Sequence, residues 1–141
     1  MVKKHFGTAQ LICRLLGGNL AEVRTQSEKL FIRQTASTRR VKFWIGANDL
    51  STEGEFRWAG SDRRVTITDW HSGQPDNYEG AEDCVHTDGE RTGTWNDEDC
   101  DERMHYICEE RWISQRVLIQ PLSICTILLE PPHGPSSSLI G

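Results

Sequence analysis

The stretch GQPDNYEGAEDC, Gly73 to Cys84, gathers several carboxylates with one Gln and one Asn. Such a run can be a solvated acidic loop, or a loop whose Pro, Asp, Asn and Gly residues form turns. It can also hold a hard cation such as Ca²⁺, which takes about six to eight oxygen ligands. A cation would convert the repulsion among the carboxylates into coordination, so the rest of the chain must decide among these three alternatives.

Length and charge narrow the classes of function. The 141 residues suffice for one domain of common size plus a tail. A net charge of -5 and a pI near 5.5 argue against a nucleic-acid-binding protein, which normally carries a basic face. Arg116 and Pro121 interrupt the most apolar run, Trp112 to Leu129, so no membrane span is expected. The first ten residues, MVKKHFGTAQ, do not show the pattern of a signal peptide.

The chain has many cysteines for its size. No C-x-x-C pair, H-E-x-x-H motif or Cys/His cluster indicates a zinc site, so disulfides are favoured. An odd number of cysteines leaves at least one without an intramolecular partner. The five are Cys13, Cys84, Cys100, Cys108 and Cys125.

The spacing of apolar residues predicts two helices near the N-terminus. In TAQLICRLLGG, residues 8–18, apolar side chains recur at helical spacing and a Gly pair follows. In TQSEKLFIRQTAS, residues 25–37, Thr25 and Glu28 have the spacing of a capping box ahead of Leu30 and Phe31. The apolar positions of the first helix are Leu11, Ile12, Leu15 and Leu16.

Beyond residue 40 the pattern changes to short β-rich runs separated by turn-rich pieces, so the predicted class is α+β. From residue 112 the alternation is lost and the composition shifts toward Pro, Gly and Ser. We therefore expect one domain over residues 1–111, and an atypical tail over 112–141 that is disordered. The β-rich runs are residues 41–47, 55–60, 64–70, 83–88 and 104–110.

Several motifs occur together in one order along the chain. They are GGNLAEV, FWIGANDLSTEGEFRW, TDWHSGQPDN, EDCV, TWND with a following Cys, and YICEE. In this order and spacing they resemble the C-type lectin domain, over about residues 5 to 110. The resemblance implies a C-type lectin-like α+β fold with two helices, small antiparallel sheets and a long Ca²⁺-binding loop region. Within that family, the chain is most similar to small secreted lectins of invertebrates.

The resemblance also implies two disulfides. Cys13 would join Cys108, connecting the first helix to the last strand, and Cys84 would join Cys100 beside the binding loops. Closures of this kind contribute roughly 3 to 5 kcal/mol, less any native strain. Cys125 in the tail has no counterpart in the family, so it is expected to be a free thiol or to link two chains.

By the resemblance, one Ca²⁺ is held by the Q-P-D triplet, a following Glu and the W-N-D motif. Carboxylates balance the charge of the cation, and amide oxygens fill further positions without adding repulsion. The bond before Pro75 is expected to be cis, as in the family. The implied ligands of this main site are Gln74, Asp76, Glu82, Asn96 and Asp97.

The resemblance implies a second, weaker Ca²⁺ site beside the first. The position of Asn77 is commonly Asp in the family, so this site has lost one charge. Its implied ligands are Asp49, Glu53, Asn77 and Asp83, together with Glu82, which the two sites share.

Sugar binding follows from the open face of the metal, where the same residues that hold the ion contact two vicinal hydroxyls. Carboxylates only accept hydrogen bonds, whereas amides can donate, so Asp76 and Glu82 would accept while Gln74 and Asn96 would donate. Within the family Q-P-D accompanies galactose-type diols and E-P-N accompanies mannose-type diols. Tyr78 follows the triplet and either stacks on the sugar or is an exposed loop residue. The implied sugar-binding residues are Gln74, Asp76, Glu82, Asn96, Asp97 and Tyr78.

Other conspicuous residues have structural interpretations. His71 and His86 are interpreted as surface polar residues. Paired carboxylates could indicate a glycosidase, but each acid has a metal assignment and no nucleophilic triad stands out, so we expect no enzymatic activity. Four tryptophans match structural positions of the family and are expected to pack in the core or the loops: Trp44, Trp58, Trp70 and Trp95.

The chain departs from the family at its N-terminus. Most members begin with a strand that pairs with the last one, whereas here Met1 falls almost at the first helix. We expect that strand to be missing, which would leave an open sheet edge around His105 to Cys108. Nothing in the pattern of residues 112–141 indicates that the tail covers this edge.

Two hypotheses from different classes follow. The first is a secreted, Ca²⁺-dependent lectin for galactose or N-acetylgalactosamine glycans, acting in innate recognition of microbial or host glycans and able to form a homo-oligomer. The second is an extracellular matrix or biomineral-interacting protein that uses its acidic Ca²⁺ loops while sugar binding is vestigial. Glycan binding measured with and without a chelator separates the two hypotheses.

Overall fold

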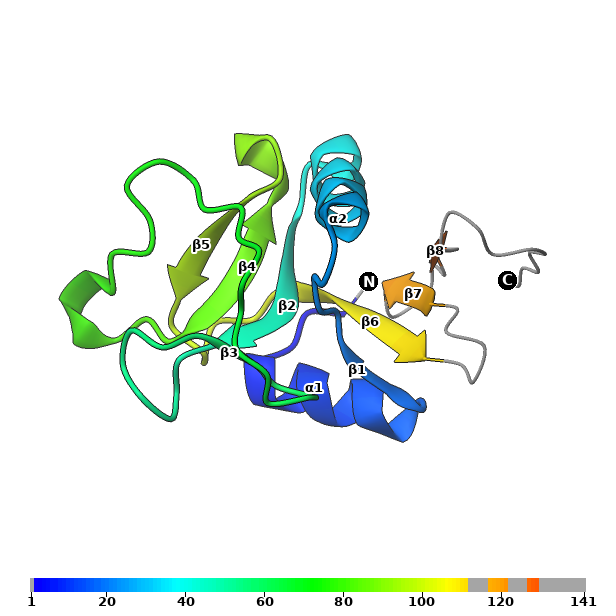
Figure 1. Ribbon diagram of the computed structural model, residues 1–141, viewed down its shortest axis with the longest axis horizontal. Coiled ribbons are helices and arrows are strands. Elements are labelled where there is room, and N and C mark those ends of the chain that lie inside the picture. The colour runs from blue at the N-terminus through cyan, green and yellow to red at the C-terminus, as the bar shows by residue number, and fades with distance from the viewer. Residues whose placement is uncertain (1, 112–116, 122–126, 130–141) are drawn as a thin grey trace.

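The computed structural model describes residues 2–111, 117–121 and 127–129, and it has two helices and a mixed sheet (Figure 1). The helices are α1 (Phe6–Leu15) and α2 (Gln26–Arg39). In the sheet, strands follow the order β5-β4-β2-β6-β7-β8, while β1 pairs with β6 and β3 pairs with β2. This arrangement confirms the predicted α+β class. The strands are β1 (Gly18–Leu20), β2 (Lys42–Asn48), β3 (Arg57–Trp58), β4 (Cys84–Asp88), β5 (Thr94–Glu98), β6 (His105–Arg111), β7 (Val117–Pro121) and β8 (Ile127–Leu129).

Helix α1 is present where predicted, but most of the apolar residues that indicated it do not form its buried face. Phe6, Ala9 and Cys13 face the core, because Cys13 is tied to Cys108 on β6. Ile12 is only partly buried, at the margin of the core. Three of the four apolar positions whose spacing indicated this helix are exposed, namely Leu11, Leu15 and Leu16.

Helix α2 begins as the capping box predicts and then buries one face against the core. Thr25 Oγ1 accepts a hydrogen bond from Glu28 N at 3.1 Å. Glu28 reaches back one residue further than a standard box, accepting from Arg24 N at 2.7 Å. The buried residues of the helix are Ile32, Thr35 and Ala36. Of the predicted apolar face, Phe31 is partly buried and Leu30 is half exposed.

Four of the five β-rich runs contain a strand, and the run over residues 64–70 does not. It makes only isolated bridges, Arg57 with Arg64 and Trp70 with Trp95. Side-chain contacts hold this segment instead of a ladder, since Arg33 pairs with Asp69 and Trp70 packs edge-on against Trp95. Strands β1 and β5 were not predicted, the first because it has three residues and the second because its residues were assigned to the metal.

The sheet separates two apolar clusters, and the tryptophans lie within them as predicted. One cluster holds Trp58 and Trp95, with Trp70 packed against it from the loops. The other holds Trp44 and Cys13 beside Phe6, between the sheet and α1. Because adjacent residues on β2 point to opposite faces, Phe43 and Trp44 serve different clusters.

Both disulfides implied by the resemblance are present. Cys13 and Cys108 lie 5.3 Å apart between Cα atoms, and Cys84 and Cys100 lie 5.2 Å apart. Both distances lie within the usual range for this bond. The first fixes α1 on the sheet, and the second joins β4 to the loop that follows β5. Cys125 lies outside the described residues.

The sheet edge beside β6 is not open over its whole length. Strand β7 pairs antiparallel with β6 from Ile107 to Arg111, and β8 pairs with β7. Near the start of β6, Lys4 forms an antiparallel bridge with Met104. The expectation of an uncovered edge is therefore wrong over residues 107–111, because the chain returns as β7. The remainder of 112–141, where a disordered tail was expected, lies outside the described residues. Within the described part of the chain, no helix is both long and apolar enough to cross a bilayer.

Candidate functional site

Two groups of carboxylates lie on the loops that leave β2 and enter β4. Asp49 directly follows β2, while Asp76 and Glu82 lie on the long connection from β3 to β4. Asp97 reaches the same region from β5, which pairs with β4 in the register Val85 to Asp97. The sheet thus positions residues from distant parts of the sequence around one group of loops, at one end of the molecule (Figure 1).

The first acidic cluster consists of Asp76, Glu82 and Asp97. One carboxylate oxygen from each lies within 4.8 Å of the others. Asp76 is exposed and Asp97 is buried, with Glu82 between these extremes. Such a graded cluster has a solvent-facing side and an anchored side.

Asp97 anchors the loop that carries the triplet. Its two carboxylate oxygens accept hydrogen bonds from Asp76 N at 3.1 Å and Asn77 N at 2.8 Å. The peptide bond between Gln74 and Pro75 is cis, as the resemblance implies. Gln74 Oε1 is buried and has no hydrogen-bond partner. A buried oxygen without a donor costs free energy, and this one is an unused acceptor on the same loop as Asp76.

The electrostatics of the first cluster show that its negative charge is not compensated. Burial, together with Asp76, Asp97 and Glu98, raises the pKa of Glu82 to about 8, although the hydrogen bond from Tyr78 N at 3.1 Å opposes the rise. A carboxylate in such surroundings binds a proton readily, and it would bind another cation for the same reason.

The second acidic cluster consists of Asp49, Glu53 and Asp83, again with one oxygen from each within 4.8 Å of the others. Asp49 Oδ2 accepts from Gly54 N at 2.8 Å, but Asp49 Oδ1 and Asp83 Oδ1 are buried without a partner. Burial raises the pKa of Asp49, and the nearby Asp83 adds to the rise. Loss of hydration, and then the hydrogen bond and charge of Asp49, raise the pKa of Glu53 to about 7.

The amide residues of the two predicted sites are placed differently. Asn77 Oδ1 accepts a hydrogen bond from Glu82 N at 3.0 Å, so this oxygen supports the loop. Asn96 is half-buried, and its Nδ2 lies 3.4 Å from His86 Nε2. Tyr78 is 62% exposed beside the first cluster, an arrangement that both of its predicted roles allow.

One histidine prediction is wrong. His86 is completely buried on β4, with its ring edge-on to Trp44 at 6.2 Å between centroids. Burial lowers its pKa to about 4, so the ring is neutral at pH 7. The sequence shows the alternation of residue types along β4, but it does not show that both faces of this strand are covered in the fold. His71 is half-buried, and its Nδ1 lies 3.0 Å from Thr94 Oγ1.

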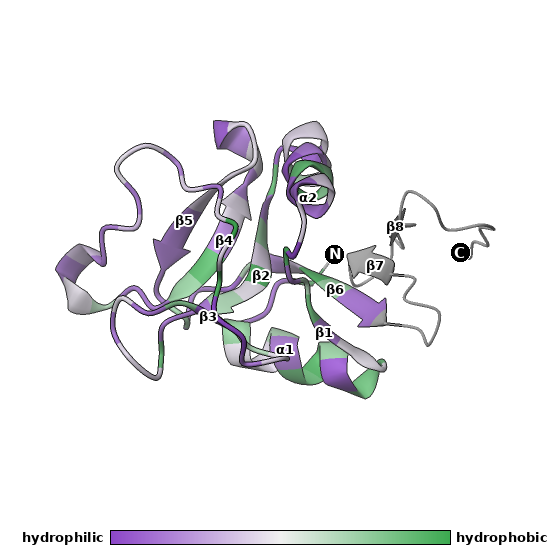
Figure 2. Ribbon diagram, viewed as in Figure 1, coloured by the Kyte–Doolittle hydropathy of each residue, from purple (hydrophilic) through white to green (hydrophobic). Residues whose placement is uncertain are grey.

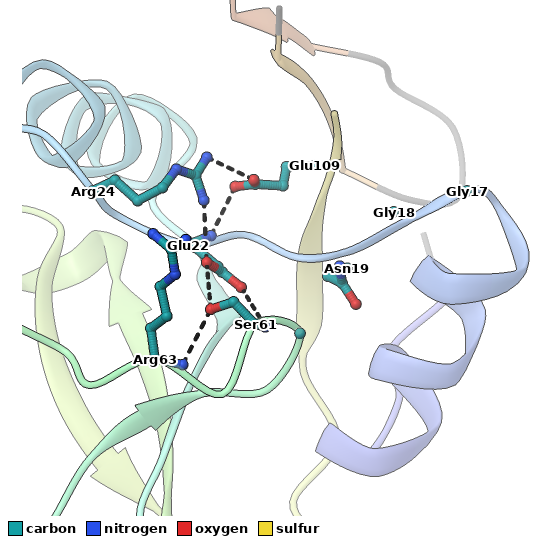
Figure 3. Close-up of a pocket in the computed structure, with 9 residues that line it drawn as sticks. Gly17, Gly18, Asn19, Glu22, Arg24, Ser61, Arg63 and Glu109 are labelled. Atoms are coloured by element: carbon teal, nitrogen blue, oxygen red, sulfur yellow. Dashed lines mark hydrogen bonds and ion pairs between the residues drawn. The ribbon is translucent and has the colours of Figure 1, made fainter. Parts of the chain in front are cut away.

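A third group of acids, which the sequence analysis did not identify, surrounds Arg24 beside a cavity of about 440 Å³ (Figure 3). Arg24 Nη2 bonds Glu109 Oε2 at 2.7 Å, and Nη1 bonds Glu22 Oε1 at 3.2 Å. Glu22 also accepts from Ser61 N at 3.0 Å. No sequence motif indicates this group, because Glu109 is 85 residues from Arg24. Its carboxylates bond to groups of the chain itself, so it is a structural cluster.

Comparisons with known proteins agree with this geometry. Residues 2–110 match the family model of the lectin C-type domain. Perlucin from Haliotis laevigata is 37% identical over 115 residues, which cover 79% of this chain and 74% of that protein.

Two solved structures are similar as well. The mouse scavenger receptor C-type lectin carbohydrate-recognition domain is 33% identical with a TM-score of 0.68, covering 75% of this chain and 82% of that one. The cow C-type carbohydrate-recognition domain of CD23, solved in the presence of a GlcNAc2Man3 oligosaccharide, is 31% identical with a TM-score of 0.67. That match covers 75% of this chain and 79% of the other.

Proposed function

This chain belongs to the C-type lectin domain family, and we propose that it binds carbohydrate through Ca²⁺ held by its acidic loops. The observation that carries the proposal is the first cluster, where Asp76, Glu82 and Asp97 converge without a cationic partner among the described residues. The family relationship supports a binding module and not an enzyme.

The donor set fits a hard cation. The three carboxylates and the unpartnered Gln74 Oε1 offer oxygen atoms, the ligand type that Ca²⁺ prefers. Asn96 would complete the main site from β5. Asp49, Glu53 and Asp83 would hold a second ion, where the unpartnered Oδ1 atoms of Asp49 and Asp83 are the supporting observation. Asn77 would contribute less, since its Oδ1 already accepts from Glu82 N.

Bound Ca²⁺ would supply coordination for two vicinal hydroxyls of a sugar. Around it, Asp76 and Glu82 would accept hydrogen bonds from those hydroxyls, while Gln74 and Asn96 would donate through their amides. This order of acceptor and donor in the triplet supports a galactose-type diol. Tyr78, exposed on the same loop, would stack on the apolar face of the sugar.

Glycan binding with and without a chelator tests the proposal. We expect galactose or N-acetylgalactosamine to bind only in the presence of Ca²⁺. The expected dissociation constant is about 1 mM, equivalent to a binding free energy of about -4 kcal/mol. Asp97→Asn serves as the negative control, because it removes the carboxylate that anchors the triplet loop. Retained Ca²⁺ binding without binding of any sugar would favour the matrix or biomineral alternative.

The sugar preference has its own test. Gln74→Glu together with Asp76→Asn exchanges donor and acceptor while keeping the ligand number and the formal charge. Ca²⁺ affinity should be retained and the preference should move toward mannose. Tyr78→Ala should weaken galactose binding by about 1 kcal/mol and leave Ca²⁺ affinity unchanged. A double variant that still prefers galactose would contradict the assignment of polarity.

An extracellular location accompanies this function. The structure holds two disulfides, between cysteines separated by 95 and 16 residues. Disulfides persist in oxidising compartments and are rare in the cytosol. Recognition of glycans on cells or microbes would use the same location, and secretion of the native protein from its source tissue would test it directly.

A further inference from the structure

The C-terminal half of helix α1 and its C-cap residue expose three leucines, here called the α1 leucine patch: Leu11, Leu15 and Leu16. Their exposed fractions are 56%, 77% and 48%. Figure 2 shows hydrophobic colour along this part of α1. Scattered apolar residues on a surface need no explanation, but a contiguous group indicates an interaction surface. Leu11 and Leu15 are four residues apart and therefore adjacent on the helix.

The α1 leucine patch cannot turn inward by rotation of the helix. Cys13 on the same helix is bonded to Cys108 of β6, and Phe6 and Ala9 are buried with it. Rotation would break this disulfide or expose the core side of α1. A partner outside the described chain is therefore needed to remove the patch from water.

The rim of the patch carries one charge of each sign. Arg14 is exposed on α1, three residues after Leu11 and therefore next to it at the edge of the patch. Glu110 of β6 lies beside the C-terminal end of α1, with its Oε2 3.5 Å from the position that a Cβ on Gly17 would take. Among the described residues, neither Arg14 nor Glu110 makes an ion pair. A patch with both signs on its rim can complement its own copy.

We propose that the α1 leucine patch is the interface of a two-fold symmetric homodimer. In such an isologous interface each contact occurs twice, so Arg14 meets Glu110 of the partner subunit and the reverse pair forms as well. The leucines of both copies bury each other between these two ion pairs. The acidic loops lie at the other end of the molecule from the C-terminal end of α1 (Figure 1), so both copies keep them open. A dimer therefore carries two sets of acidic loops, and two weak binding sites on one assembly bind a multivalent ligand with avidity.

The first test is the mass in solution, measured by sedimentation equilibrium in the Cys125→Ser background, which excludes a covalent dimer through that residue. Cys125→Ser alone should be dimeric, and adding Leu15→Arg should give monomer, because a charge cannot be buried without a partner. Leu30→Arg is the matched control: Leu30 is 50% exposed on α2, outside the patch. That control should stay dimeric. A monomeric parent at about 100 μM, or a dimeric Leu15→Arg protein, overturns the proposal.

Charge-reversal variants test the proposed pairing of Arg14 with Glu110 across the interface. Arg14→Glu and Glu110→Arg alone should each raise the dimer dissociation constant by at least about tenfold, because like charges then oppose each other twice. The double variant should restore the parent value. Matching thermal melts of all variants would show that they fold. A double variant that remains as weak as the single ones would exclude the pairing of Arg14 with Glu110.

Discussion

Two groups of three carboxylates in this molecule are held in opposite ways. Glu22, Glu28 and Glu109 all contact the guanidinium of Arg24, at 3.2, 3.3 and 2.7 Å. Asp76, Glu82 and Asp97 are equally crowded, yet no Lys, Arg or His among the described residues pairs with any of them. The chain provides its own cation in the first group, whereas none of its described cationic side chains pairs with the second group.

The hydrogen bonds of the two groups differ in the same way. Glu22 and Glu109 are buried, and both accept from main-chain amides as well as from Arg24. Around the acidic loops, buried acceptors remain without donors, namely Gln74 Oε1, Asp49 Oδ1 and Asp83 Oδ1. Acidity alone therefore does not identify a binding site. The unsatisfied oxygens support the proposed ion sites, because folding leaves few such atoms unless a ligand completes them.

Removing the internal cation should have the largest effect. Arg24→Met leaves the buried Glu22 and Glu109 without their cation. Because a buried charge without a partner is costly, we expect the free energy of unfolding to fall by roughly 3 to 5 kcal/mol. Urea denaturation of both proteins measures the difference.

Arg63→Met is the matched control for that variant. Arg63 lines the same cavity but is exposed, and within the described residues its side chain makes no ion pair. Its loss should change stability by less than about 0.5 kcal/mol. Equal losses from Arg24→Met and Arg63→Met would show that the cavity, and not the ion cluster, carries the stability.

Adding the external cation should have the next largest effect. If Ca²⁺ binds only the folded loops, a concentration 100-fold above its dissociation constant stabilises by about 2.7 kcal/mol. Melting curves with Ca²⁺ and with a chelator measure this gain. Asp97→Asn should lose most of it, whereas Arg63→Met should retain it. Identical melting curves for folded wild-type protein with Ca²⁺ and with chelator would contradict the proposal of both ion sites.

The pH dependence should reverse when Ca²⁺ is added. Without Ca²⁺, the raised pKa values of Glu82, about 8, and Glu53, about 7, mean that the folded state binds more protons than the unfolded state. Stability should therefore fall as pH rises from about 4.5 toward 8. With Ca²⁺ the ligands must be deprotonated, so the Ca²⁺-dependent gain should grow over the same interval. Melts across this interval, with and without chelator, check the two slopes, and parallel slopes would contradict the idea of competing cations.

A smaller loss of stability, still above that of the Arg63→Met control, is expected from Ser61→Ala. Ser61 Oγ donates to Glu22 Oε1 at 3.1 Å, at the rim of the Arg24 cluster. Glu22 keeps Arg24 and the amide of Ser61, so the loss should be about 1 kcal/mol. Ca²⁺ affinity should not change, since the two groups of acids are separate. Calorimetric titration with Ca²⁺ beside a denaturant curve measures both quantities.

Local patterns were enough for the helices and the fold class, whereas the cysteine pairs came from the family resemblance. The capping box at Thr25 rests on a spacing of three residues, and the structure retains it. The apolar spacing in α1 was correctly taken as a helix, but spacing alone could not say which side faces the core. Cys13 decides that side through a partner 95 residues away. For the same reason the exposed state of Leu15 was not predictable.

The oxygen-rich residue types of the acidic loops, their order along the chain and the family they indicate were determined by the sequence itself, because they depend on residue identity and short spacing. Tertiary structure alone decided which carboxylates remain unsatisfied. Arg24 meets Glu109 across 85 residues, while no described cation reaches Glu82. Burial and long-range pairing are properties of the packed chain, and they set both the pKa of an acid and its readiness to bind a cation.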